Sequence, residues 1–74
     1  MSKADVRILC EMCRSDYPNV NAIIALVKNK PFIAKSNDWY GMAPVQYLAM
    51  NKKIDAATFS MILAEAPKLK ADYE

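Results

Sequence analysis

Two cysteines, Cys10 and Cys13 in the segment CEMC, are the residues whose spacing most suggests chemistry. Thiol–disulfide exchange by such a pair needs a helix N-terminus, where the helix dipole lowers the pKa of the thiol. Here the pair falls in the middle of a predicted helix, on its apolar stripe. A zinc site would need two further ligands, and the chain has no other cysteine and no histidine. We therefore expect two buried structural thiols, with no metal and no cofactor.

The other side chains that could act as catalysts are poorly grouped. The absence of histidine excludes Ser-His-Asp and Cys-His mechanisms. The carboxylates Asp5, Glu11, Asp16 and Asp38 are scattered along the chain, with no shared apolar pocket evident in the pattern. We therefore expect a protein that is not an enzyme.

Length and composition indicate one folded domain over residues 1–74. The chain has 74 residues, of which 54% are hydrophobic, and a domain of this size buries only about 60% of its unfolded surface. No apolar run approaches the roughly 18 residues of a membrane helix, and the N-terminal segment does not resemble a signal peptide. We expect an intracellular, cytoplasmic protein that makes no membrane contact, with the nucleus not excluded.

Periodicity predicts four short helices and no strand, which is an all-α fold. Apolar residues at helical spacing mark residues 3–14 and 20–29, and Pro31 ends the second segment. Pro44 opens a short third helix. Asp55 is the predicted N-cap of the fourth, which Pro67 terminates. The irregular segment PFIAKSNDWYGM separates the two pairs of helices.

The second half of the chain repeats the first. Pro31 and Pro67 are 36 residues apart, and ADVRILC (4–10) aligns with APVQYLA (43–49) at a shift of 39. A period in the thirties with two helices per unit is typical of helical repeats. Small residues at two matched positions, Cys10 and Ala49, predict close helix packing. The expected fold is two stacked helix-turn-helix units, at about 2–36 and 37–74, joined by a finger loop.

The segment DWYGMAPVQYLA resembles the ankyrin repeat signature. Asp38, Gly41, Pro44 and Ala49 match the family pattern, and Val45 replaces its leucine conservatively. The departures are Ala43 for threonine, Gln46 for histidine and Leu48 for the inner alanine. The chain is thus similar to a divergent pair of ankyrin repeats.

This resemblance implies a non-catalytic protein–protein interaction module. In ankyrin repeats the chain between two units projects as a finger, and this finger and the first helix form the partner-binding face. By position, the residues that would contact a protein partner are Trp39, Tyr40, Met42, Met50 and Asn51. Trp and Tyr are common in binding hot spots, and Met adapts to irregular surfaces. In the alternative interpretation, Trp39 folds back over Phe32 or the neighbouring repeat as a lid on the core.

Two further hypotheses concern other partners. The net charge of +2 leaves open a small basic helical nucleic-acid binder that uses Arg7, Arg14, Lys52 and Lys53. Repeat stacks usually need three or more units, and Ile8 and Met61 lie outside the main apolar stripes of their helices. We therefore expect either self-association through an end face or a longer repeat array in which neighbouring units cover these ends.

Overall fold

A computed structural model of the chain describes residues 3–70 and is all-α, as predicted. The outer limits predicted for the two units, residues 2 and 74, lie outside the described residues, as do Tyr73 and Glu74, where the repeat pattern predicts the start of a further finger. None of the described helices has the length and apolar character needed to cross a membrane. The elements in chain order are the α-helices α1 (Lys3–Arg14) and α2 (Val20–Asn29), the 3₁₀ helix η1 (Pro31–Ile33), the α-helices α3 (Pro44–Met50) and α4 (Ala56–Glu65), and the 3₁₀ helix η2 (Pro67–Leu69).

Helices α2, α3 and α4 begin where a side chain forms a hydrogen bond with a backbone N–H that has no partner within the helix. The side chain of Asn19 accepts a hydrogen bond from the N–H of Ala22 at 3.1 Å and caps α2. The predicted cap of α4 is confirmed, because Asp55 accepts from the N–H of Thr58 at 2.8 Å. At α3, Ala43 has no hydroxyl to cap the helix, and a bond in the reverse direction compensates for it. The Oε1 atom of Gln46 accepts from the N–H of Ala43 at 2.7 Å.

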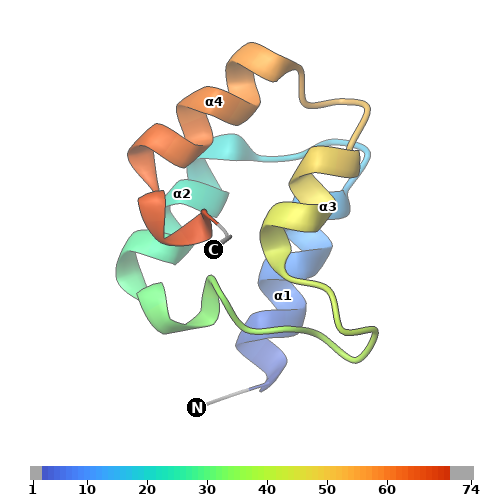
Figure 1. The fold of residues 1–74 in the computed structure, drawn as a ribbon, viewed down its shortest axis with the longest axis vertical. Coiled ribbons are helices and arrows are strands. Elements are labelled where there is room, and N and C mark those ends of the chain that lie inside the picture. Colours follow the sequence, from blue (N-terminus) through green and yellow to red (C-terminus); the bar gives the residue numbers. More distant parts are fainter. Residues whose placement is uncertain (1–2, 71–74) are drawn as a thin grey trace.

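The helices form two layers (Figure 1). Helix α1 packs along α3, and α2 contacts α4. Each second helix is followed by a 3₁₀ turn that starts with a proline, so the order of helix, helix and 3₁₀ turn occurs twice. The molecule measures 31 × 28 × 23 Å. The long connection from η1 to α3 crosses the N-terminal part of α1 and then projects beyond α1 and α3.

Positions that match in the two halves differ in burial. At a shift of 39 residues, Tyr47 in α3 is only 7% exposed, whereas its match Ile8 in α1 is 49% exposed. In the reverse sense, Cys10 is buried in α1 and its match Ala49 is exposed. Close packing is therefore confirmed at Cys10, but the prediction for Ala49 is wrong. The junction between the halves, where α1 packs along α3, therefore covers a different face of each helix.

The core is formed by residues from every helix and is apolar throughout the described range. Its buried hydrophobic members are Val6, Leu9, Cys10, Cys13, Ile23, Val27, Ile33, Ala34, Tyr47, Leu48, Ile54, Ile62, Ala66 and Leu69. The expected burial of both cysteines is thus confirmed. Burial raises the pKa of the Cys10 thiol to about 11 and that of Cys13 to about 12. Both thiols are therefore protonated at neutral pH and poor nucleophiles.

Asn51, directly after α3, joins the two halves by hydrogen bonds. Its Nδ2 amide donates to the backbone carbonyls of Cys13 and Ser15, both at 2.9 Å, at the end of α1. Its Oδ1 atom accepts from the N–H of Lys53 at 2.8 Å. One half-buried side chain therefore closes the end of α1 and orders the turn after α3.

We predict that Asn51→Ala lowers the free energy of unfolding by about 1–3 kcal/mol, the usual cost of leaving such backbone groups unpaired. Urea unfolding followed by circular dichroism measures the change. The matched control is Asn37→Ala, at an exposed loop position, which should change the stability by less than about 0.5 kcal/mol. Equal effects of the two substitutions would contradict a linking role for Asn51.

Candidate functional site

The finger, residues 38–42, is a tight turn closed by its own backbone. The N–H of Asp38 donates to the carbonyl of Met42, and the N–H of Gly41 donates to the carbonyl of Asp38, both at 3.0 Å. Gly41 has a φ of 75°, in the left-handed region that a residue with a Cβ rarely adopts. The one glycine of the chain therefore lies where the turn requires it.

The carboxylate of Asp38 fixes this turn to α3. Its Oδ1 atom accepts hydrogen bonds from the N–H of Tyr40 at 2.9 Å and of Met42 at 3.1 Å. Its Oδ2 atom accepts from the hydroxyl of Tyr47. Tyr47 is itself buried where α3 packs on α1, so the position of the finger is coupled to the packing of the helices.

These contacts shift the pKa values of both partners. The hydrogen bond from Tyr47 lowers the pKa of Asp38, and the backbone N–H groups of Met42 and Tyr40 and the charge of Arg14 add to this effect against partial desolvation. The same hydrogen bond, with burial, raises the pKa of Tyr47 to about 12. The guanidinium of Arg14 lies 5.8 Å from the centre of the Tyr47 ring, within the range of a cation–π contact.

The two aromatic residues at the tip of the finger project into solvent. Trp39 is 81% exposed and Tyr40 is 79% exposed. Trp39 borders a hollow together with Arg7 and Ile8 of α1. The alternative in which Trp39 forms a lid on the core is therefore wrong.

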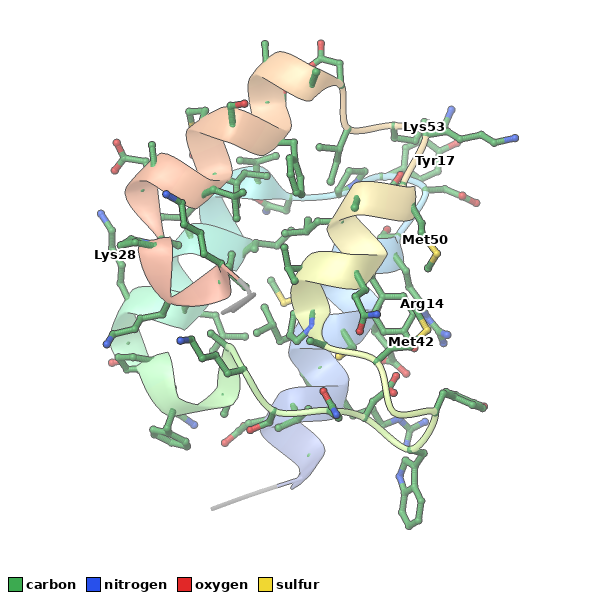
Figure 2. The ribbon with its side chains drawn as sticks, in the orientation of Figure 1. Arg14, Tyr17, Lys28, Met42, Met50 and Lys53 are labelled. Carbon is green, nitrogen blue, oxygen red and sulfur yellow. The ribbon has the colours of Figure 1, made fainter. Side chains whose placement is uncertain are left out.

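The other three predicted contact residues lie in different environments. Met50, the last residue of α3, is 61% exposed, on the same side of the molecule as Arg14 (Figure 2). Met42 is half-buried and packs against the core. Asn51 lies next to Met50, but its amide is engaged with Cys13 and Ser15, which is a structural role that the sequence pattern did not indicate.

Two adjoining hollows connect the finger to the end of α3, and we call them together the groove. The first has a volume of about 180 Å³ and is lined by Arg7, Cys10, Glu11, Arg14, Asp38, Trp39 and Tyr40. The second has about 320 Å³ and is lined by Arg14, Asp16, Tyr47, Met50, Asn51, Lys52 and Lys53. Arg14 belongs to both hollows. The groove is shallow and open, which suits a segment of a macromolecule better than an enclosed small ligand.

Of the charged α1 residues that line this site, Arg7 and Arg14 are predicted only for the nucleic-acid hypothesis, and Glu11 is missed. Arg7, Glu11 and Arg14 recur at helical spacing, so they share one exposed face. The shift of 39 residues that aligns the two halves matches them with Gln46, Met50 and Lys53. This alignment could have identified Met50 and Lys53 as neighbours of Glu11 and Arg14, because residues at matched positions of stacked repeats lie side by side.

The pKa shifts predict how stability depends on pH. Because folding raises the pKa of Tyr47 from its ordinary 10.0 to about 12, the contribution of its hydrogen bond is fully present below pH about 10 and is lost as the pH rises toward about 12. Because folding lowers the pKa of Asp38, its contribution is present above the unfolded pKa of about 3.9 and is lost as the pH falls below that value.

We predict that Tyr47→Phe is less stable than the wild type at neutral pH and loses less stability between pH about 10 and 12. Urea midpoints measured across this range test the prediction, and phenolate absorbance of the wild type minus that of the variant reports the ionisation of Tyr47. Tyr40→Phe, on the exposed finger tip, is the control and should keep the alkaline dependence of the wild type. Identical alkaline slopes for the wild type and Tyr47→Phe would contradict the assignment.

Comparisons of the chain with protein-family models, curated proteins and solved structures give no match. In residues 3–70, no group of three or more His, Cys, Asp or Glu side chains is placed to hold a metal ion. The candidate site is therefore defined by the geometry of the chain itself: a braced aromatic finger beside a shallow groove over α1 and α3.

Proposed function

We propose that the protein is a non-catalytic protein–protein interaction module, an ankyrin-like scaffold that binds a partner protein through the finger and the groove. The proposal combines the resemblance of residues 38–49 to the ankyrin signature with the arrangement of the site. The proposed contact residues are Trp39, Tyr40, Met42, Met50 and Asn51, of which Met42 also packs against the core and Asn51 also bonds the end of α1.

The observation that carries the proposal is the exposure of two aromatic side chains on a braced turn. Trp39 and Tyr40 are 81% and 79% exposed, which leaves a large apolar area in water that a marginal domain would otherwise bury. The bonds of Asp38 hold the backbone beneath them. A preorganised aromatic surface loses little conformational entropy on binding, and Trp and Tyr dominate binding hot spots.

Proteins captured from a cell lysate by the wild type and by Trp39→Ala, identified by mass spectrometry, test this function. We predict that Trp39→Ala weakens binding of the captured partner by about 2 kcal/mol, roughly 30-fold, while the melting temperature changes little. Phe32→Ala is the matched control, because Phe32 is an exposed aromatic residue of η1 that does not line the groove. A collapse of the melting temperature with unchanged affinity of the folded fraction would contradict the proposal.

A second proposal concerns the outer faces of the two units, which we infer bind a second copy of the chain. On the outer face of the first unit, Ile8 is 49% exposed at the position where its match Tyr47 is buried in the junction. On the second unit, Phe59 and Leu63 are half-exposed, while their matches at a shift of 36, Ile23 and Val27, are buried. Met61, also predicted for this role, is 42% exposed and matches the exposed Ala25. The positions matched to Ile8, Phe59 and Leu63 are buried where the two halves of the chain meet. A second copy of the chain is therefore the partner whose surface fits the outer faces.

We predict that the wild type self-associates at about 100 µM, as expected for a dissociation constant near 10 µM, and that Ile8→Glu shifts it toward the monomer. Sedimentation velocity measures the species. Ala25→Glu places the same charge at an exposed position of α2 and should leave the association unchanged. A wild type that sediments only as a monomer at this concentration would contradict self-association.

A further inference from the structure

We infer that the partner segment for the groove is an extended acidic peptide. It places an apolar side chain against Trp39 and Tyr40 and its carboxylates against Arg14, Lys52 and Lys53. This inference rests on the proposed function and adds the chemistry of the partner. It follows from how the groove distributes its charged and apolar side chains between its two ends.

The positions of charged and apolar side chains along α1 and α3 distinguish the two ends of the groove. Arg14 in α1 matches Lys53 after α3, so the two cations occupy the same end, with Lys52 beside them. Between the two ends, Glu11 of α1 and the exposed Met50 of α3 are at matched positions, 39 residues apart. Trp39 and Tyr40 border the other hollow. Figure 2 shows Lys53, Met50, Arg14 and Met42 following one another along one side of the molecule, toward the finger.

The cationic end is not neutralised within the described part of the chain. Arg7 is paired with Glu11 at 3.2 Å, and the other ion pairs there join Lys28 to Glu65 and Lys30 to Asp5, so none of them involves the three cations of the groove. Three positive side chains therefore line the second hollow against one carboxylate, that of Asp16. A segment with carboxylates at this end is complementary in charge.

The finger end of the groove has a different character. Its charges balance, because Arg7 pairs with Glu11 and because Arg14, which lines both hollows, acts on the carboxylate of Asp38. What remains exposed there is aromatic surface. An apolar side chain is therefore the complementary group at the finger, and negative charge belongs only at the far end.

This uneven distribution favours a peptide over a nucleic acid. A nucleic-acid strand carries one phosphate per nucleotide and is bound by cations all along its path. Here the carboxylates of Glu11 and Asp38 offset the two cations that line the first hollow, so this part of the path offers such a strand no net positive charge. A peptide can place its carboxylates at one end only. The longest dimension of the molecule, 31 Å, corresponds to about nine residues of extended chain.

Selection from a library of random peptides of about 12 residues, which reach roughly 40 Å when extended, tests the inference without knowledge of the partner. We expect peptides retained by the wild type to contain at least about twice the library frequency of Asp and Glu, with an aromatic or large aliphatic residue several positions away. Selection on Trp39→Ala should lose the apolar preference. Selection on the double variant Lys52→Glu/Lys53→Glu should lose the acidic one.

Affinities of one selected peptide give the quantitative test. The double variant Lys52→Glu/Lys53→Glu should weaken binding by about tenfold or more. Lys68→Glu, at an exposed lysine of η2 outside the groove, is the control and should remain within about twofold of the wild type. An unchanged affinity for the double variant would overturn the inference.

The remaining outcomes separate the inference from the proposed function. Peptides that depend on Trp39 but show no acidic preference would overturn the acidic partner and leave the interaction module standing. A selection without any Trp39-dependent peptide would contradict both. A single-stranded oligonucleotide of about 20 nucleotides that displaces the peptide and binds more tightly, with a steep dependence on salt, would overturn the peptide in favour of a nucleic acid.

Discussion

The carboxylate of Asp38 is the contact on which the rest of the site depends. It accepts hydrogen bonds from the backbone of the finger and from the hydroxyl of Tyr47. The ring of Tyr47 is in turn buried between α1 and α3 and lies beneath the guanidinium of Arg14. One side chain therefore couples the turn that presents the aromatic residues, the junction between the helices and a cation of the groove. Such a charge-assisted network in a partly buried place is stronger than separate surface contacts.

A domain this small can remain folded with two exposed aromatic residues because the core formed by its described residues contains no buried charge that would lower its stability. Every core position is apolar in the described range, so no buried charge has to be compensated there. The polar links between the halves are few among the described residues: Asn51 ties α3 to the end of α1, and Lys28 of α2 pairs with Glu65 of α4 at 3.3 Å. Because these links lie at the ends of the helices, they fix the register of the two layers without placing polar atoms in the core.

Much of this fold could be predicted from local chemistry. Asp55, Pro44, Pro31 and Pro67 define helix ends through hydrogen bonds or missing donors within a few residues, and Gly41 marks the turn through its backbone freedom alone. Roles that depend on contacts between distant residues were not predictable in this way. Asn51 resembled an exposed contact residue because its acceptors, at Cys13 and Ser15, are more than 30 residues away in the chain. Ala49 resembled a packing residue, but its helix face lies away from the junction.

The two ends of the groove can contribute differently to the proposed binding because their side chains differ in freedom. Trp39 and Tyr40 rotate about few bonds and stand on a turn that is already ordered, so they lose little entropy when a partner covers them. Lys52 and Lys53 are long and exposed, and holding them in one geometry is costly, so their direct contribution to affinity is small. Their charge acts over a longer range and raises the rate of encounter with an acidic segment. The lifetime of the complex and the apolar preference would then be set at the finger, and the acidic preference, the speed of capture and the orientation of the segment at the cationic end.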